Sequence, residues 1–400
     1  MNIVICGGGV IGASIAYFLG ERGASATLVE RADIAGAASG KSGGFIARDW
    51  CDGQPQAELA RASFDLHAEL ARTLDTDYGY RRIDTLLVAG SDRGGFERYG
   101  AAASPEWLDG RCAVHSAIGS PRTTATIHPE RFTRALVDAA CARGVRLVRG
   151  TVDGIARDLG GAVRGVRVDG TEIAADAVVI AMGPWSILAT QWLPLPPVAG
   201  LKGYSVVLAP RVPVPAQALF VEYENASGER TSPEIVVRAD GEVWACGLSS
   251  DDPLPIDPSD ISVDEVKCRE IARICAALSS RLDGADVLRT QACYRPICAD
   301  AMPLLGPVPD VPGAYVATGH NCWGMLNAPA SGRAMAELLC DGASSSVDLA
   351  PFDPARLEAV RSDDAADQGS RIEGLDPPQG KVRGGHEPCV DHDHAHDRGR

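Results

Sequence analysis

The first thirty residues contain an apolar run, a helical pattern and a second apolar run. Residues 2–6 and 26–29 are almost entirely apolar, as expected of short buried strands. Between them, large apolar residues recur at the spacing of a helix, and Gly23 follows as a typical helix stop. These helical positions are Ile11, Ile15, Phe18 and Leu19. The pattern therefore predicts a strand, a helix and a strand, in that order.

Glycines and one acidic residue occupy fixed places in this segment. Gly7, Gly9 and Gly12 fit the pattern Gly-x-Gly-x-x-Gly, and Glu30 closes the second strand. Such a turn lets a pyrophosphate approach the helix N-terminus, while the acid accepts ribose hydroxyls. The acid disfavours a 2′-phosphate, so NADP is not expected and NAD or FAD remains. The residues expected at this cofactor are Gly7, Gly9, Val10, Ile11, Gly12, Glu30 and Arg31.

A second glycine- and serine-rich stretch follows at residues 36–44. Its composition predicts a loop and not a helix, with backbone N–H groups free to surround a phosphate or a ribitol chain. A flexible linker is the alternative interpretation of the same residues. The candidates for cofactor contact here are Ser39, Gly40, Ser42, Gly43 and Gly44.

The middle of the chain continues the alternation of helix and strand. Pro129 suits the first turn of a helix that runs to Arg143, and 145–148 read as a strand. Asp169-Gly170 marks a hairpin. The run at 177–182 is fully apolar, as in a central parallel strand. Ligands bind beyond the carboxyl ends of such strands, so the turn with Gly183 and Trp185 is expected at the cofactor.

From about residue 198 to 294 the pattern changes to short alternating strands with one helix near 263–278. A last α/β unit follows, with a strand at 314–318 and a helix at 328–339. We therefore predict an α/β protein, α+β overall. It combines a Rossmann-like dinucleotide-binding domain with an inserted antiparallel-sheet substrate domain. The predicted ranges are 1–80, 128–197 and 296–350 for the first domain, 81–127 and 198–295 for the second, and 351–400 for a disordered tail.

Composition and charge narrow the classes of function. The net charge of −15 argues against a nucleic-acid surface. No apolar run reaches the length of a transmembrane helix, and a strand beginning at residue 2 leaves no room for a signal peptide, so an intracellular, cytoplasmic protein is expected. The 12 cysteines lack Cys-x-x-Cys spacing, which favours reduced, buried thiols over zinc. No metal site is predicted, and the histidine-rich segment 386–400 is interpreted as a disordered tail.

Taken together, these segments resemble the D-amino-acid-oxidase-like family of FAD-dependent oxidoreductases, which includes glycine oxidase and sarcosine oxidase. The resemblance covers nearly all of residues 1–345. It rests on the first fingerprint and on six further blocks, at 39–44, 127–129, 177–186, 200–203, 294–296 and 319–332. The stretches 40–45 and 49–52 (Asp-Trp-Cys-Asp) are similar to an uncharacterised eukaryotic branch of the family.

The resemblance implies FAD as the cofactor, bound non-covalently, with its isoalloxazine between the two domains. It implies that the turn after the last strand approaches the pyrimidine edge of the flavin; the residues concerned are Gly319, His320, Asn321, Trp323, Gly324 and Met325. It also implies that Arg295 grips a substrate carboxylate and that Tyr294 lines the same pocket. An internal ion pair is the alternative for Arg295. A hydrogen-bonded structural role is the alternative to catalysis for His320.

Two departures from the family pattern bear on function. Sarcosine-oxidase-type members carry an active-site lysine where this chain has Cys246-Gly247-Leu248-Ser249. Some relatives attach flavin through a cysteine near Cys293, although the spacing does not match cleanly. The leading hypothesis is oxidation of the C–N bond of a small amine or amino acid. The alternatives are a dehydrogenase that passes electrons to an acceptor other than oxygen, and a flavin-binding trafficking or regulatory protein without fast turnover.

Overall fold

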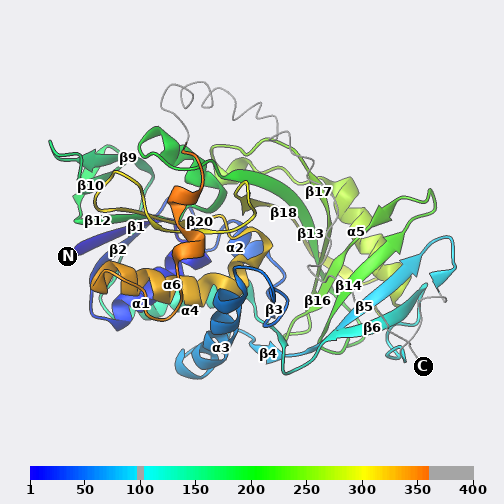
Figure 1. The fold of residues 1–400 in the computed structure, drawn as a ribbon. Helices are drawn as coiled ribbons and strands as arrows, with labels where there is room; N and C mark the ends of the chain where they lie inside the picture. Colours follow the sequence, from blue (N-terminus) through cyan, green and yellow to red (C-terminus); the bar gives the residue numbers. More distant parts are fainter. Residues whose placement is uncertain (97–102, 360–400) are drawn as a thin grey trace, which may run out of the picture.

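A parallel sheet with helices on one face forms the first half of the molecule (Figure 1). The computed structural model describes residues 1–96 and 103–359. The sheet has six strands, all parallel except for the antiparallel edge strand β19. In spatial order they are β19 (Leu304–Pro307), β20 (Ala314–Thr318), β12 (Ala177–Ile180), β1 (Asn2–Cys6), β2 (Ser25–Glu30) and β8 (Arg146–Arg149).

Alternation of side chains along β1 divides the core of this half into two layers. Ile3 and Ile5 pack with the helices on one face, whereas Val4 and Cys6 pack with a small antiparallel sheet on the other. The helices on the first face are α1 (Val10–Glu21), α3 (Ala57–Thr73), α4 (Pro129–Ala142) and α6 (Gly324–Asp341). The small sheet consists of β9 (Val152–Arg157), β10 (Val163–Val168) and β11 (Thr171–Ala174).

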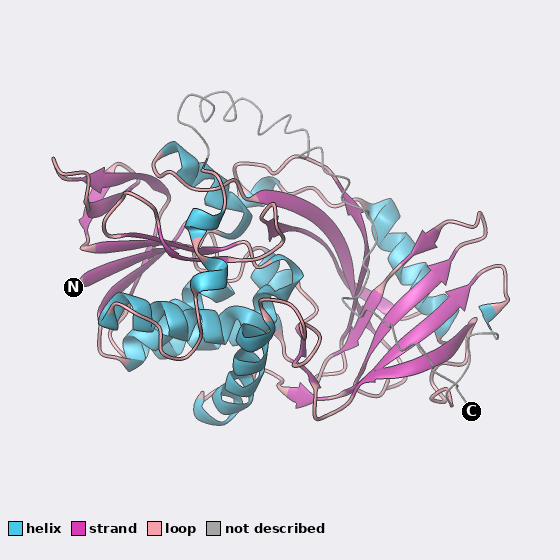
Figure 2. Ribbon diagram, in the orientation of Figure 1, coloured by secondary structure: helices cyan, strands magenta, loops and turns pink. Residues whose placement is uncertain are grey.

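A large curved sheet forms the second half (Figure 2). It has eight strands and is antiparallel except where β14 pairs with β5. In spatial order they are β18 (Asp286–Ile297), β13 (Ala199–Ala209), β17 (Val243–Ser250), β16 (Glu234–Val237), β14 (Gln217–Glu224), β5 (Asp84–Ser91) and β6 (Cys112–Gly119), with β15 (Arg230–Thr231) on β14. Helix α5 (Glu265–Leu278) packs on the outer face of this sheet, and the inner face is directed toward the first half of the molecule.

A third, short sheet connects the two halves. It joins β3 (Phe45–Ala47), β7 (Thr124–Thr126) and β4 (Arg81–Arg82), which lie next to α3 and the large sheet. The predicted fold class is confirmed: a Rossmann-like sheet with a second, mostly antiparallel sheet domain. The exact domain ranges stay a prediction. Among the described residues, none of the helices has the length and apolar character needed to cross a membrane.

Two local predictions were wrong. The second glycine-rich stretch contains one helical turn, α2 (Ala38–Lys41), because a single bond from the Ser42 N–H to the Ala38 carbonyl closes it. The predicted tail begins too early, since Phe352 is buried and Arg356 pairs with Asp300 at 2.7 Å. The histidine-rich segment 386–400 lies outside the described residues.

Candidate active site

The first glycine turn is shaped by backbone contacts at two of its three glycines. Gly7 has a φ of +114°, and a Cβ there would collide with the carbonyl oxygen of Ala181 at the end of β12. A Cβ at Gly12 would collide with the Gly7 carbonyl oxygen. At Gly9 an added Cβ would meet only the Ser39 hydroxyl, at 3.1 Å. Gly7 and Gly12 are therefore required by the turn itself, whereas Gly9 leaves space for a ligand.

Glu30 and Ser39 are fixed around this space. The Glu30 carboxylate accepts hydrogen bonds from the backbone N–H groups of Gly8, at 2.6 Å, and Ala32, at 2.7 Å. The Ser39 hydroxyl accepts one from the N–H of Val10, at 2.9 Å, at the start of α1. Each carboxylate oxygen keeps a second lone pair, and the serine keeps its proton to donate. These groups suit a ribose and a phosphate respectively.

The second glycine-rich stretch is held by the large sheet. Trp244 donates to the Lys41 carbonyl at 2.9 Å, and Arg238 donates to the Ser42 carbonyl at 3.0 Å. The Lys41 amine in turn donates to the Ala292 carbonyl on β18, at 3.1 Å. These contacts fix the C-terminal end of α2, which does not fit the flexible-linker alternative.

Several buried polar atoms near these segments have no hydrogen-bond partner. They are the Ser42 hydroxyl, the Nδ1 atom of His320 and the amide oxygen of Asn327 in the first turn of α6. Buried polar groups in proteins nearly always have a partner, so these atoms indicate a bound polar group. Gly319 and Asn321 take positive φ values, +78° and +51°, which form the turn before α6. The donor set and the open space at Gly9 both fit a dinucleotide.

Three predicted site residues hold one segment of the chain at 253–257. Tyr294 donates from its hydroxyl to the Pro253 carbonyl at 2.7 Å, and Trp185 donates to the Pro255 carbonyl at 2.8 Å. Arg31 donates to the Ile256 carbonyl at 2.8 Å and pairs with Asp257 at 3.0 Å. Trp185 and Arg31 therefore join the first half to this segment of the second, whereas Tyr294 holds the segment within the second half.

Tyr294 does not line the pocket of Arg295, contrary to the prediction. The two residues are neighbours on β18, and side chains of a strand alternate between faces. Tyr294 is 2% exposed and lies with Lys202 on the outer face.

Arg295 lies among groups that favour its charge on the inner face of the large sheet. Burial acts to lower the pKa of its guanidinium, but nearby Cys246, Glu234 and Cys322 raise it above its usual value. Cys322 belongs to the turn before α6, so Arg295 stands where the sheet meets that turn. Glu234 is the acidic group of the site, and the sequence did not indicate it.

Comparison with known proteins agrees with this geometry. A family model described as FAD dependent oxidoreductase matches residues 2–338. The chain belongs to this family. Putative oxidoreductase C1F5.03c of Schizosaccharomyces pombe is 30% identical over 380 residues, which are 88% of this chain and 97% of that protein. Glycine oxidase of Bacillus licheniformis is 28% identical over 388 residues, 90% of this chain and 98% of that protein.

Solved structures share the fold. Glycine oxidase from Geobacillus kaustophilus matches with a TM-score of 0.74 at 24% identity, over 89% of this chain and 98% of that one. FAD is therefore the cofactor of this family member, and the resemblance seen in the sequence is confirmed. NAD, the alternative left open by the first fingerprint, is not the family's cofactor.

His320 of this FAD-dependent oxidoreductase is a buried, neutral side chain. Burial lowers the pKa of His320 to about 3, and its Nε2 atom lies 3.0 Å from the Ser331 hydroxyl. The ring is therefore uncharged across the neutral range, which fits the structural alternative. Its backbone forms a bridge with Ile297 at the end of β18, so it joins the turn before α6 to the large sheet.

Acidification is expected to destabilise the protein through His320 and His67. Burial lowers the pKa of His67 to about 4, so both rings bind protons only in the unfolded chain between these values and about 6.5. The free energy of unfolding therefore decreases as the pH falls below about 6.5, by up to about 1.4 kcal/mol per pH unit for each histidine. Urea unfolding between pH 7 and 5 measures this slope.

His320→Asn should make that slope shallower. His115→Asn is the matched control, since His115 is exposed. An unchanged slope in the His320 variant, with wild-type pH dependence throughout, would contradict the assignment of a neutral buried ring.

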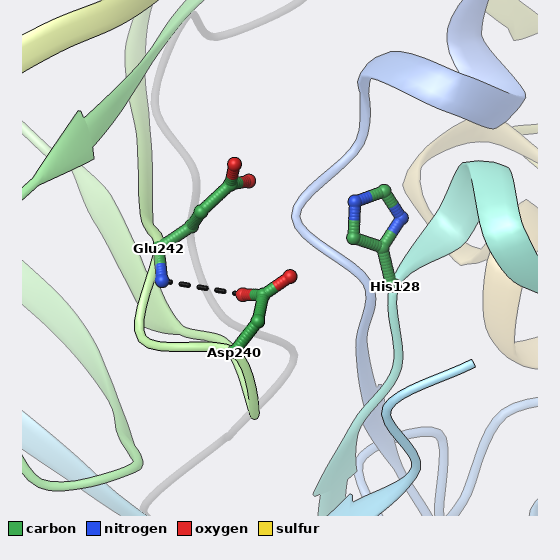
Figure 3. A group of neighbouring side chains, drawn as sticks. All are labelled: His128, Asp240 and Glu242. Carbon is green, nitrogen blue, oxygen red and sulfur yellow. Dashed lines mark hydrogen bonds between the residues drawn. The ribbon is translucent and has the colours of Figure 1, made fainter. Parts of the chain in front are cut away.

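A cluster of His128, Asp240 and Glu242 lies where the two halves meet (Figure 3). Their potential ligand atoms are all within 4.8 Å of one another. The acids are, however, paired with arginines: Asp240 with Arg131 at 3.1 Å, and Glu242 with Arg289 at 2.6 Å and Arg238 at 3.1 Å. These cations oppose a metal ion, and Arg131 joins the β16–β17 hairpin to the start of α4. The same Arg238 holds the second glycine-rich stretch.

Proposed function

We propose that this protein oxidises the C–N bond of a small amino acid or amine, with FAD bound non-covalently. The observation that carries the proposal is Arg295, a guanidinium on the sheet face beside the turn at residues 319–323. We call this turn before α6 the flavin turn, because the proposal places it at the flavin. An arginine fork matches a carboxylate with two parallel hydrogen bonds. The relatives named glycine oxidase support an amino-acid substrate for this site as well.

In this proposal the residues of the chain orient the substrate. When bound, FAD supplies the acceptor for the hydride that leaves the substrate carbon. Arg295 holds the carboxylate, so that the neighbouring C–H bond is directed toward the space between the sheet and α6. The ammonium group of the bound amino acid first loses one proton to solvent, because only the neutral amine has a lone pair. That lone pair forms the C=N bond as the hydride departs, and water then hydrolyses the imine to a carbonyl compound and ammonia. This chemistry depends on orientation more than on a strong base.

Anaerobic titration of the FAD-loaded protein tests the proposal. A panel of amino acids, imino acids and amines is added, and bleaching of the oxidised flavin absorption is recorded. We expect at least one amino acid to bleach the flavin, whereas the hydroxy acids of the same shape do not. No bleaching by any member of the panel would overturn the proposal. Acid precipitation then checks attachment, since non-covalent flavin stays in the supernatant and flavin linked through Cys293 does not.

A dehydrogenase that passes its electrons to an acceptor other than oxygen is the second candidate function. Ser249 is exposed at the place of the active-site lysine of sarcosine-oxidase-type members. Lys202 does not replace that lysine, because it is buried on the outer face and pairs with Asp252 at 2.9 Å. Stopped-flow reoxidation of the reduced protein by air and by a quinone dye separates the two. Rapid reoxidation by air would remove this candidate.

A further inference from the structure

Four aromatic side chains form a continuous wall close to Arg295. Trp50 lies 4.7 Å from Phe220 and 5.1 Å from Phe45, measured between ring centroids, and 6.5 Å from Trp323. All four rings are half-buried, so each keeps an accessible edge or face. They come from the segment after α2, from β14 and from the flavin turn. We call Phe45, Trp50, Phe220 and Trp323 the aromatic wall.

The Asp-Trp-Cys-Asp stretch holds Trp50 in this wall. Asp49 pairs with Arg48 at 2.7 Å, and Asp52 pairs with Arg61 on α3. Cys51 is 1% exposed and packs in a small core between α3 and the short connecting sheet. The indole N–H of Trp50 donates to the Ile118 carbonyl at 3.2 Å. These contacts therefore hold the stretch in place and fix the position of the Trp50 ring.

Strand pairing brings the aromatic wall to Glu234 and Arg295. Phe220 on β14 lies directly opposite Glu234 on β16. Directly paired residues of neighbouring strands point to the same face, so both side chains are on the inner face. Glu234 and Cys322 both interact electrostatically with Arg295, and Trp323 follows Cys322 in the chain. These relations place Arg295, Glu234 and the aromatic wall next to one another on the inner face of the large sheet.

We propose that this site selects a zwitterionic amino acid with a large apolar substituent, and that Glu234 recognises its ammonium group. The inference deepens the proposed function and rests on it. Arg295 and Glu234 attract each other, and a zwitterion offers each of them an opposite charge without changing the net charge of the site. The ammonium hydrogen-bonds the Glu234 carboxylate, while the carboxylate occupies Arg295. A large apolar substituent covers the aromatic wall, which glycine would leave in water.

The two alternatives for Arg295, binding of a substrate carboxylate and an internal ion pair, then describe the same site with and without substrate. Without substrate, Arg295 and Glu234 interact electrostatically with each other. With substrate, the two side chains separate to hold the two charges of the amino acid. Glu234 is thus a specificity-determining residue of the reaction.

Ligand titrations of the FAD-loaded protein test this inference. The probes are glycine, both enantiomers of phenylalanine, and phenylacetate, which has the carboxylate and the ring but no amine. Flavin bleaching reports oxidation, and tryptophan fluorescence reports binding independently of turnover. We expect one phenylalanine enantiomer to bind at least about tenfold more tightly than glycine. Tighter binding of glycine would overturn the proposal.

Two variants assign the recognition to named residues. Glu234→Gln should weaken phenylalanine binding by about tenfold and leave phenylacetate binding equal or stronger, because only phenylalanine carries the ammonium. Phe220→Ala should weaken both ring-bearing ligands and not glycine. Glu222→Gln is the control, since Glu222 is exposed on the same strand as Phe220. An equal effect of Glu234→Gln on phenylalanine and phenylacetate would contradict a role in amine recognition.

The outcomes separate this inference from the proposed function. If phenylalanine binds as expected but nothing bleaches the flavin, the proposed oxidation fails and the binding preference stands. If glycine alone bleaches the flavin, the oxidation stands and the preference fails. The wild-type comparison of glycine with phenylalanine decides the second case even where a variant does not fold.

Discussion

Replacing Arg295 with alanine is expected to lower kcat/KM for the best amino-acid substrate by about a thousandfold. Truncating one partner of a buried, hydrogen-bonded charge pair between protein and ligand costs about 2–5 kcal/mol, and here it also leaves Glu234 near the substrate carboxylate. The loss should appear mainly as a higher apparent Kd in anaerobic flavin reduction, because the arginine holds the substrate before and during the reaction. Stopped-flow reduction at increasing substrate concentration measures both constants.

Two further variants give this experiment its controls. Arg295→Lys keeps the charge but loses the paired fork, so an intermediate defect of about ten- to a hundredfold is expected. Arg289→Lys, on the same strand, is the matched control, since Arg289 is half-exposed and pairs with Glu242. If Arg295→Ala leaves the apparent Kd unchanged and lowers only the unfolding free energy, Arg295 is an internal ion-pair residue and the proposed carboxylate site is wrong.

The cofactor half was predictable because its signals are local in the sequence. The Gly7–Gly12 turn, its helix and Glu30 lie within about thirty residues, and each has a fixed geometric reason. The change to short alternating strands likewise predicted the second sheet. What such patterns do not contain is the partner of each strand. The parallel pairing of β14 with β5 joins segments more than a hundred residues apart.

The substrate side of the site was largely missed for the same reason. Glu234 stands in an ordinary Pro-Glu-Ile-Val-Val sequence, and only its pairing with Phe220 and Cys246 turns it toward Arg295. A register shift in β13 next to Tyr204 also breaks the simple alternation from which one would predict which side chains lie on the inner face. Simple alternation, however, already predicts that Tyr294 and Arg295 point to opposite faces. That signal was in the sequence.

Gly9→Ala and Gly12→Ala are expected to fail in different ways, although both change one atom of the same motif. In Gly12→Ala the new methyl collides with the Gly7 carbonyl, a backbone atom fixed between β1 and β12. The turn must open, so we expect a loss of stability of about 3 kcal/mol or more and little folded protein, since domains are stable by only about 5–15 kcal/mol. In Gly9→Ala the methyl meets only the Ser39 hydroxyl, at 3.1 Å, and no backbone atom.

Gly9→Ala should therefore fold as wild type and bind FAD at least about a hundredfold more weakly, because the methyl fills the space that the pyrophosphate needs. Flavin content after gel filtration measures binding, and urea unfolding of the apoprotein measures stability. Gly23→Asn is the control, since Gly23 has a φ of +67° with open space around it and lies away from the turn. It should cost little stability and leave FAD binding intact. Normal FAD binding by Gly9→Ala would place the pyrophosphate elsewhere, and the roles of Ser39 and Glu30 would fall with it, because all three residues border the same space.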